Sequence, residues 1–356
     1  MICYLHIGTP KTGTTSIQNL LVLNRKILKT KKIIYPMSLC YNNQHGGIRH
    51  FIKNYSIEKV NKDKNYLKLK AEILSNAECS FLFSDELISL HIHDFQSIMS
   101  LKKFFKDLGF QKVVCVIYLR DNPEAAISQS SQLIKCGAKH SIMRRAELTM
   151  IIHNYKILCE NYKNIFGKEN IIVRLFDKNE FYQGDLLKDF IHSVGLEWDD
   201  KFIIPPKQNE TLDLIGFELQ KRLNKLGCGF DNYSYSTKLF SDKYFSSKEL
   251  SLKFQPPKEI IQSYIDCFEE SNEWVRKEFF PHKERLFPKK DLSNYKENYE
   301  LKEMKPEYWD RIAEFIADII KTKTQPVTNQ NSTCNKPNSQ AQSKLSFQTK
   351  YGTAKS

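Results

Sequence analysis

The most constraining feature of this sequence is an alternation of short apolar runs with amphipathic stretches through its N-terminal half. Five runs rich in β-branched or aromatic residues predict strands, at Ile2–Ile7, Lys32–Tyr35, Ser80–Ser84, Val113–Leu119 and Ile171–Phe176. Apolar residues at helical spacing predict helices at Thr14–Leu28, Tyr66–Asn76, Asp94–Leu108, Pro123–Cys136, Ala146–Phe166 and Gly184–Val194. Because strands separated by helical crossovers pair in parallel, we expect a three-layer α/β fold with a central, mostly parallel sheet flanked by helices.

The remainder of the chain reads as helical, and no further strand is predicted there. Helices are expected at Leu212–Leu226, Pro257–Phe280 and Lys305–Ile320. We therefore expect an α/β core over residues 1–210 and a helical part over 211–321 that completes the same domain. Residues 322–356 consist mainly of Thr, Gln, Asn, Ser and Lys, a composition that predicts a disordered basic tail.

Charge and cysteine content narrow the partners and the compartment. The formal net charge is +13, and the last 36 residues contain six lysines and no acid. A basic balance favours anions in general, so nucleotides, polyanionic substrates, nucleic acid and acidic membranes all fit it. The nine cysteines form no C-x-x-C pair, which predicts reduced thiols. No apolar run reaches the roughly 20 residues of a membrane helix, and a strand begins at the N-terminus, so we expect a cytoplasmic protein without a transmembrane segment.

The strongest local signal is a glycine-containing loop between the first strand and the first helix, His6-Ile7-Gly8-Thr9-Pro10-Lys11-Thr12-Gly13-Thr14-Thr15-Ser16. Gly8 and Gly13 have the spacing of a P-loop, which turns backbone N–H groups inward, and the helix N-terminus points at the same place. The pattern predicts a cradle for a phosphate-like anion on a fold of the P-loop NTPase type. A glycine-bearing turn without a ligand is the structural alternative.

The lysine of this loop stands in an unusual position. A nucleoside triphosphatase loop carries Lys directly after its second glycine, followed by Ser or Thr. Here that position is Thr14, and the lysine is Lys11, two residues before Gly13. From inside the loop, Lys11 could reach the bridging oxygen between a bound anion and its leaving phosphate. The displacement argues against an ATP-hydrolysing loop.

At these residues the sequence resembles the sulfotransferases that use 3′-phosphoadenosine 5′-phosphosulfate (PAPS) as donor. Their 5′-phosphosulfate loop is similar to Pro10-Lys11-Thr12-Gly13-Thr14-Thr15-Ser16. The resemblance implies that Lys11 contacts the oxygen that bridges to the sulfuryl group, and that the 5′-phosphate is held by Gly13, Thr14, Thr15 and Ser16. Gly8 and Thr12 are counted in the same donor site. It also implies PAP, the desulfated nucleotide, as product and no metal.

A second anion site is predicted at the end of the fourth strand, in Tyr118-Leu119-Arg120-Asp121-Asn122-Pro123. Ligands of open α/β sheets bind beyond the carboxyl ends of the strands, so Arg120 and the glycine loop should share one crevice. A guanidinium fork and the hydroxyl of Ser128 suit a phosphate. The pair also resembles the signature that holds the 3′-phosphate of PAPS, with the proline one residue later than in many relatives. A surface ion pair of Arg120 with Asp121 or Glu124 is the alternative.

The resemblance extends to about residue 225 and favours the bacterial carbohydrate-type members. These enzymes have sequences similar to the segments Ile171–Phe176, Gly184–Phe190 and Val194–Leu196. The segment Asn209-Glu210-Thr211-Leu212 is similar to an Asn-x-Ser-Leu element near the nucleotide, which places Asn209 in the predicted donor site.

The reaction also requires a base that deprotonates the acceptor. Related enzymes use Glu or His. Glu86 follows the third strand and is the first choice, with a helix N-terminal carboxylate as its structural alternative. His45 resembles a His-x-x-Leu element of the bacterial group and is the second candidate, although an acceptor-binding or structural role fits it equally. His91 and His93 lack a third ligand, so no metal site is predicted.

The sequence thus predicts a sulfotransferase acting on a hydroxyl or amine of an acceptor, for which a bacterial glycan is the favoured class. Residues 211–321 are the candidate acceptor-binding part. Two alternatives stay open: a P-loop nucleotide or sugar kinase, and a non-catalytic polyanion-binding protein suggested by the basic charge.

Overall fold

The computed structural model describes residues 1–53, 55–140, 143–206, 211–227, 239–246 and 252–324. The chain forms two compact units, Met1–Phe315 and Ile316–Ser356. The described part of the second unit is the C-terminal portion of helix α14 (Pro306–Thr324). All features below belong to the first unit.

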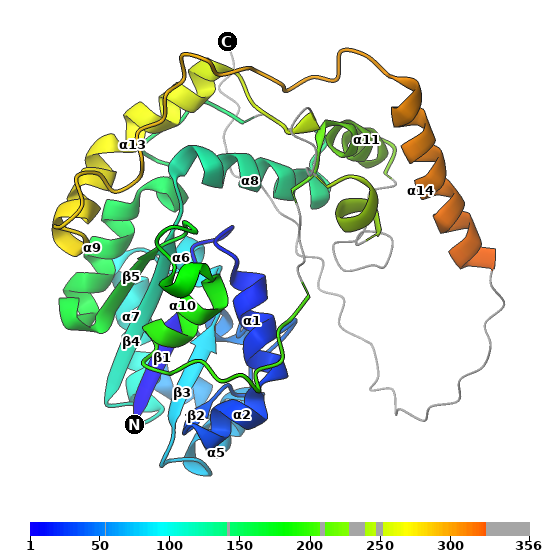
Figure 1. Ribbon diagram of the computed structural model, residues 1–356. Coiled ribbons are helices and arrows are strands. Elements are labelled where there is room, and N and C mark those ends of the chain that lie inside the picture. The colour runs from blue at the N-terminus through cyan, green and yellow to red at the C-terminus, as the bar shows by residue number, and fades with distance from the viewer. Residues whose placement is uncertain (54, 141–142, 207–210, 228–238, 247–251, 325–356) are drawn as a thin grey trace. The chain divides into compact units, whose positions relative to one another are not determined.

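A five-stranded sheet forms the centre of the first unit, and its strand order is β2-β3-β1-β4-β5 (Figure 1). The strands are β1 (Ile2–His6), β2 (Ile33–Ile34), β3 (Ser80–Ser84), β4 (Lys112–Leu119) and β5 (Ile171–Leu175). Every pairing is parallel. Since each strand is followed by helix before the next strand begins, the carboxyl ends of all five lie at one edge of the sheet. The predicted α/β fold is confirmed.

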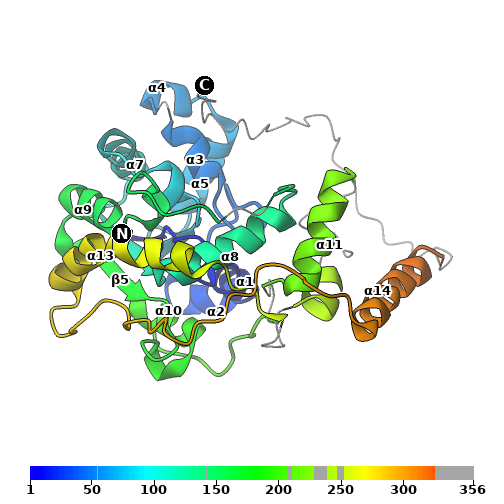
Figure 2. The ribbon, with the colours of Figure 1, turned by 90° about the horizontal axis from the view of Figure 1, so that it is seen from above.

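Helices cover both faces of the sheet, and the alternation of side chains along the strands explains why. Leu5, Phe83 and Ile117 point into one apolar core, which they share with α3 (Gly47–Ile52), α5 (Lys64–Leu74), α7 (Phe95–Asp107) and α9 (Tyr155–Phe166). Leu82 and Tyr118, one position along, point into the other core. That second core is closed by α1 (Thr14–Leu23), α2 (Arg25–Thr30) and α10 (Leu186–Ser193). Figure 2 shows the elements from above.

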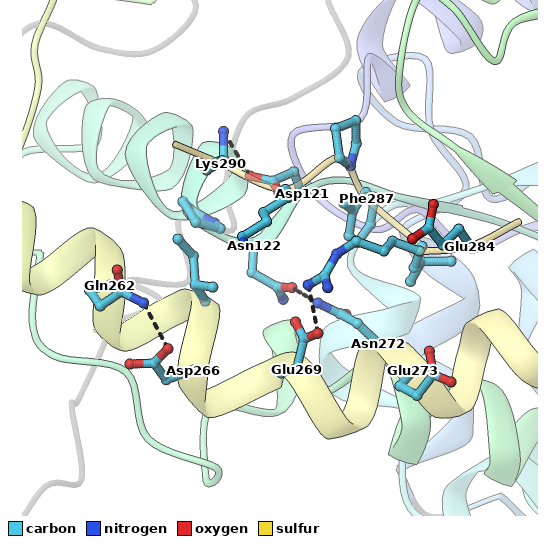
Figure 3. A pocket seen from close by; sticks show the side chains of 16 residues that line it. Asp121, Asn122, Gln262, Asp266, Glu269, Asn272, Glu273, Glu284, Phe287 and Lys290 are labelled. Carbon is cyan, nitrogen blue, oxygen red and sulfur yellow. Dashed lines mark hydrogen bonds and ion pairs between the residues drawn. The ribbon is translucent and has the colours of Figure 1, made fainter. Parts of the chain in front are cut away.

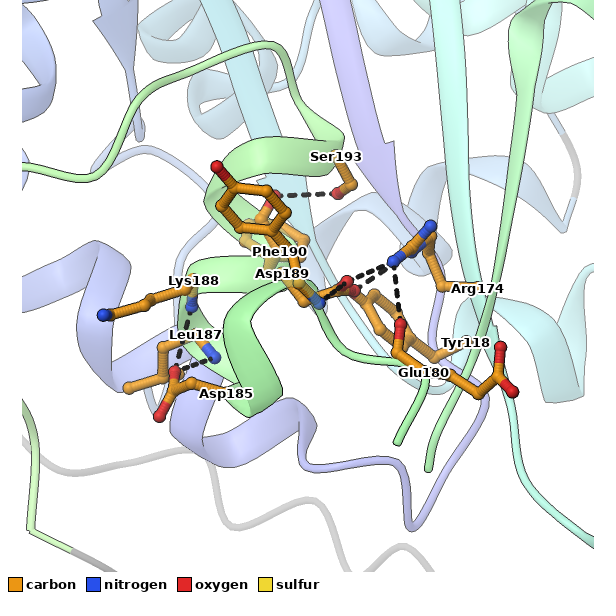
Figure 4. Close-up of polar contacts among 10 residues, drawn as sticks. Tyr118, Arg174, Glu180, Asp185, Leu187, Lys188, Asp189, Phe190 and Ser193 are labelled. Atoms are coloured by element: carbon orange, nitrogen blue, oxygen red, sulfur yellow. Dashed lines mark hydrogen bonds and ion pairs between the residues drawn. The ribbon is translucent and has the colours of Figure 1, made fainter. Parts of the chain in front are cut away.

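A buried ionic network fixes α10 to the sheet (Figure 4). Asp189 of α10 is fully buried and pairs with Arg174 of β5, whose Nε lies 3.0 Å from the carboxylate. The same carboxylate accepts hydrogen bonds from the Tyr118 hydroxyl at 2.6 Å and from the Tyr182 backbone N–H at 2.7 Å. Because every partner of this buried charge is supplied by a different element, the network sets the position of α10.

The predicted helical C-terminal part is confirmed. Helix α8 (Asn122–Lys135) follows β4 directly, and α11 (Leu214–Lys225) and α13 (Lys258–Phe279) pack against it. Shorter elements complete the unit: α4 (Ile57–Val60), α6 (Ile88–His91), η1 (Ile151–His153), η2 (Lys168–Asn170), η3 (Tyr182–Gly184) and the π-helical turn η4 (Leu239–Tyr244). Within the described ranges, we find no helix that combines the length and the apolar character needed to span a bilayer.

Two helix predictions were wrong in their boundaries. The helix expected at Thr14–Leu28 is broken at Asn24. The Asn24 side-chain amide donates to the Ile203 carbonyl at 2.9 Å and accepts a hydrogen bond from the Ile203 N–H at 2.8 Å. The helix expected from Ala146 begins only at Tyr155, after the 3₁₀ turn η1. Asn154 caps this later start, and the Ala146 N–H is bound instead by the Ser263 hydroxyl at 3.0 Å. Both boundaries therefore depend on side chains at the helix ends and on contacts with residues distant in sequence.

Candidate functional site

The loop between β1 and α1 continues the pairing of the sheet beyond the end of β1. The Tyr118 N–H donates to the Gly8 carbonyl at 2.7 Å, and the Thr9 N–H donates back to the Tyr118 carbonyl at 3.0 Å. The Thr9 hydroxyl binds the same carbonyl at 2.9 Å. These bonds hold the loop at the carboxyl end of β4, which is the edge where α/β sheets bind ligands.

Close packing around the loop requires glycine at both ends. Gly8 has a φ of +99°, and a Cβ there would lie 2.8 Å from the backbone oxygen of Glu86. Gly13 has a φ of +72°, and a Cβ there would overlap the side chain of Leu186 on α10. Residues other than glycine rarely adopt a backbone conformation with positive φ. The two glycines thus let the loop approach the segment after β3 and α10 at the same time.

The N-terminal end of α1 is available to an anion. Gly13 is its N-cap, no side chain caps the helix, and its first turn contains no acidic residue. Thr14 is buried, whereas Thr15 and Ser16 are partly exposed. The Thr12 hydroxyl donates to the Thr9 carbonyl at 2.5 Å, so that side chain braces the loop from within. The first N–H groups of α1 carry the positive end of the helix dipole, and of these the Ser16 N–H donates to the Gly13 carbonyl at 3.0 Å.

Lys11 is held inside the site by a residue of α8. Its ammonium group donates to the Gln132 side-chain oxygen at 3.2 Å. Burial lowers the pKa of Lys11, the neighbouring Glu86 carboxylate raises it, and the Arg120 charge lowers it. A partly desolvated ammonium group attracts an anion more strongly than an exposed one, because less water screens the charge.

Arg120 lies against the glycine loop. Its Nη1 donates to the Lys11 backbone carbonyl at 3.0 Å. Its Nη2 lies 3.9 Å from the Glu124 carboxylate, and the guanidinium lies over the Phe176 ring, 5.4 Å from the centroid. The backbone of Arg120 is fixed by the Tyr155 hydroxyl at 2.5 Å. The loop and the end of β4 therefore form one site, and the ion pair considered as an alternative for Arg120 is present within it.

Glu86 closes the side of the site next to β3. Its carboxylate accepts a short hydrogen bond from the Thr14 hydroxyl of α1, and the group is partly buried. The turn that carries Glu86 is fixed by the Asp85 N–H, which binds the His6 carbonyl at 3.0 Å. The Glu86 carboxylate and the Lys11 ammonium interact electrostatically. A carboxylate and an ammonium group thus face the same end of α1.

His45 lies next to the end of β3, and both nitrogens of its ring are hydrogen-bonded to backbone groups. The Ser84 N–H donates to Nδ1 at 3.1 Å, and Nε2 lies 3.0 Å from the Pro36 carbonyl. The first bond requires that Nε2 carry the proton and donate. The ring is completely buried, and this burial lowers the pKa of His45 to about 4.

Two further residues were predicted for the donor site. Ser128 is buried on α8, eight residues after Arg120 along the chain. Asn209 lies outside the described residues.

Several residues of the site carried no recognisable signal in the sequence. Gln132 binds Lys11, and Phe176 lies beneath Arg120. Lys290, from the segment after α13, pairs with Asp121 at 3.3 Å and with Glu124 at 3.1 Å. A glutamine within a helix or a lysine far along the chain looks like any solvated residue, so only the fold reveals these contacts.

Two cavities adjoin the N-terminal end of α8. The first has a volume of about 390 Å³, and its lining includes Asn122, Asn272 and Phe287 (Figure 3). Its charged lining consists of five carboxylates, Asp121, Asp266, Glu269, Glu273 and Glu284, and three cations, Arg285, Lys289 and Lys290. This lining is unfavourable for a phosphate. The second, of about 340 Å³, has Phe254 and Tyr295 in its walls and borders Glu124, the ion-pair partner of Arg120.

Comparisons with known proteins give few matches. No protein-family model matches the chain. An uncharacterized protein from Archaeoglobus fulgidus is 24% identical over 142 residues, which make up 40% of this chain and 37% of that protein. The chain therefore matches little more than a third of the length of this curated relative. A solved structure of a sulfotransferase from Alicyclobacillus acidocaldarius is 14% identical, with a TM-score of 0.33, and the match covers 64% of this chain and 96% of that one. Likeness at this level leaves the functional argument to the geometry of the site.

Proposed function

We propose that the protein transfers a sulfuryl group from PAPS to a hydroxyl or amine of an acceptor. The observation that carries the proposal is the contact between the Arg120 guanidinium and the Lys11 carbonyl, because it joins two anion-binding elements into one site. One element is the glycine loop with the open end of α1, and the other is the end of β4 with the start of α8. A donor with phosphate groups at both its 5′ and 3′ positions needs two such elements.

The donor would lie across these two elements. The N–H groups at the start of α1, from Gly13 to Ser16, would hold the 5′-phosphosulfate, and the tight turns at Gly8 and Thr12 would shape the loop around it. Arg120 and Ser128 would hold the 3′-phosphate, with Asn209 as a further nucleotide contact. The first turn of α1 has no side-chain cap and no acidic residue of its own, which fits a phosphate, and the Glu86 carboxylate beside it is offset by the Lys11 ammonium group.

The chemistry would be an in-line displacement at sulfur. The acceptor oxygen or nitrogen forms a bond to sulfur while the bond between sulfur and the bridging oxygen breaks, and PAP leaves. Lys11 would stabilise the charge that develops on the bridging oxygen. Glu86 would take the acceptor's proton, because its carboxylate faces the loop, whereas both ring nitrogens of His45 are already bound by the backbone.

Two features favour this function over the alternatives. In a kinase of the P-loop type, the residue after the second glycine is the phosphate-binding lysine. Here it is Thr14, and its hydroxyl is engaged by Glu86. A polyanion-binding protein without catalysis needs no carboxylate beside its buried ammonium group, yet Glu86 and Lys11 interact within this site.

Calorimetric titration with PAP, and separately with ATP and Mg²⁺, tests the proposal. We expect PAP to bind without metal and ATP to bind weakly. Lys11→Ala should abolish PAP formation from PAPS, with water or an added sugar as the sulfuryl acceptor, and retain most PAP affinity, since the 5′-phosphate contacts come from α1. Lys26→Ala, at an exposed position on α2, is the matched control and should leave both unchanged. Indifference to PAP, or PAP formation by Lys11→Ala at the rate of the unmodified protein, would refute the proposal.

A further inference from the structure

Helix α5 carries apolar side chains on its outer face as well as on its inner one. Its buried side chains are Tyr66, Leu69 and Ile73. On the opposite face, Leu67 is 45% exposed and Leu74 is 68% exposed. At the helical pitch, Leu67, Leu74 and the exposed Ala71 lie within about 60° of one another around the axis. The helix therefore presents a short apolar stripe to solvent.

Lysines border this stripe on both sides. Around the helix axis, Lys70 lies about 40° from Leu74, and Lys64 lies about 20° from Ala71 on the other side. Lys68 follows Lys64 by one turn, and both are exposed. Within the described ranges none of these three lysines has an ion-pair partner. Each ammonium group is thus available to an anion, while its methylene chain can lie along apolar surface.

The turn before α5 extends the positive charge. The Lys62 N–H donates to the Lys59 carbonyl at 3.2 Å, so the two lysines share a tight turn between α4 and α5, and both are exposed. Residues 53–71 contain six lysines and two acids, Glu58 and Asp63. The Asp63 carboxylate caps α5, where it accepts hydrogen bonds from two N–H groups of the first turn at 2.7 and 3.1 Å. Its charge is therefore directed at the helix end.

A third exposed apolar side chain lies beside α5. Met37 is 72% exposed, and its N–H donates to the Glu72 carboxylate of α5 at 2.9 Å. The Ser38 N–H binds the same carboxylate at 3.0 Å. Glu72 is the only acid in α5, so the one negative charge of this helix is engaged by backbone donors.

These residues form what is here called the α5 surface: Met37, Lys59, Lys62, Lys64, Leu67, Lys68, Lys70 and Leu74. We propose that the α5 surface binds the anionic headgroup region of a lipid bilayer, with Leu67 and Leu74 inserted below the headgroups. Anionic lipids attract the lysines, and the acyl boundary accepts the apolar stripe between them. A nucleic acid duplex would satisfy the charges and leave the leucines in water, so the combination favours a bilayer.

The α5 surface is separate from the proposed donor site. Helix α5 packs into the core on one face of the sheet, whereas α1 and α10 pack on the other face (Figure 2). Attachment through α5 would therefore not involve the helix N-terminus that is proposed to hold the donor.

Co-sedimentation of the full chain with vesicles tests the inference. One preparation contains phosphatidylglycerol mixed with phosphatidylcholine, and the other contains phosphatidylcholine alone. Leu74→Ser removes an apolar side chain from the α5 surface. Leu148→Ser is its matched control, because Leu148 is 63% exposed and lies on another segment.

A second pair of variants tests the charge. Lys64→Glu with Lys68→Glu reverses two charges of the α5 surface. Lys296→Glu with Lys302→Glu makes the same change in net charge at exposed positions between α13 and α14. Circular dichroism and urea denaturation check that each variant is folded.

We expect the unmodified protein to bind the anionic vesicles at least about tenfold more tightly than the neutral ones. Binding should weaken about tenfold or more in the charge variant of α5 and about threefold or more in Leu74→Ser, while both controls bind as the unmodified protein does. Equal binding of the two vesicles, no binding of either, or equal losses in the α5 variants and their controls would overturn the inference.

Undiminished binding by Leu74→Ser would overturn it as well, since the α5 surface would then act through charge alone, as a site for a polyanion such as nucleic acid does. The inference does not depend on the proposed function, because binding of PAP enters none of these outcomes.

Discussion

Gly8→Ala offers a sharp test of the packing that builds the site, because the chain contains a matched glycine elsewhere. Gly8 and Gly137 have nearly the same φ, +99° and +97°. A Cβ at Gly8 would lie 2.8 Å from the Glu86 backbone oxygen, whereas at Gly137 no atom lies within 4 Å. The two substitutions share the conformational penalty and differ in the steric one.

The expected magnitudes follow from that difference. Positive φ destabilises an alanine by about 1–2 kcal/mol at either position. Crowding against fixed backbone adds about 1–3 kcal/mol at Gly8 alone. Urea denaturation should therefore show a loss of about 2–5 kcal/mol in the free energy of unfolding for Gly8→Ala and about 1–2 kcal/mol for Gly137→Ala.

Gly8→Ala should also impair the site itself, because relief of the crowding must move either the loop or Glu86. We expect PAP formation from PAPS to fall in this variant and to persist in Gly137→Ala, measured under conditions in which both proteins are folded. Equal losses of stability in the two variants would refute the reasoning, since they would show that the loop does not depend on close approach to the segment after β3.

Two further predictions concern protonation. Gln132→Leu removes the hydrogen-bond acceptor of a partly desolvated ammonium group, which should lower the pKa of Lys11 further. PAP formation from PAPS should then slow by about 10- to 100-fold, and the alkaline limb of its pH profile should move to lower pH. Burial lowers the pKa of His6 to about 3 and the pKa values of His45 and His153 to about 4. Below about pH 6.5 each of these histidines therefore becomes protonated in the unfolded chain while it stays neutral in the folded protein. The stability from these three groups should be complete above about pH 6.5 and fall as the pH drops toward 4, by about 1.4 kcal/mol per pH unit for each histidine, as followed by urea denaturation at a series of pH values.

Controls separate these effects from general destabilisation. Gln262→Leu removes an exposed side-chain contact on α13 and should leave PAP formation from PAPS unchanged. An unchanged alkaline limb in Gln132→Leu would contradict the positioning of Lys11 by Gln132. Stability that is constant between pH 6.5 and pH 4.5 would contradict the buried, neutral state of the histidines.

Much of the fold could be predicted from the sequence because its signals are local. β-Branched and aromatic runs marked all five strands, and helical periodicity marked most of the longer helices. The boundaries at Asn24 and Ala146 were missed because they depend on Ile203 and Ser263, which are far along the chain. Short helices such as α3, α4 and α6 were missed because one or two turns carry no clear period.

For the candidate site, loop spacing and strand ends predicted that Lys11 and Arg120 lie near each other, and in the structure the Arg120 guanidinium contacts the Lys11 carbonyl. Sequence reasoning ranked Glu86 ahead of His45 without a decisive argument, because the burial of an imidazole depends on the whole fold. Gln132 and Lys290 could not be found at all, since their partners lie on other elements. What they contribute is set by tertiary packing rather than by a motif.

One consequence of α8 concerns how such a protein tolerates length changes. Asp121, the N-cap of α8, pairs with Lys290, and Gln132 near the end of the helix binds Lys11, so one rigid helix carries contacts at two places in the candidate site. Inserting one residue between Ser128 and Gln132 would rotate everything after it by about 100° and shift it by about 1.5 Å. Lys11 would lose its partner, while Arg120 stayed in place. The candidate site therefore depends on the number of residues in this helix as well as on their identity.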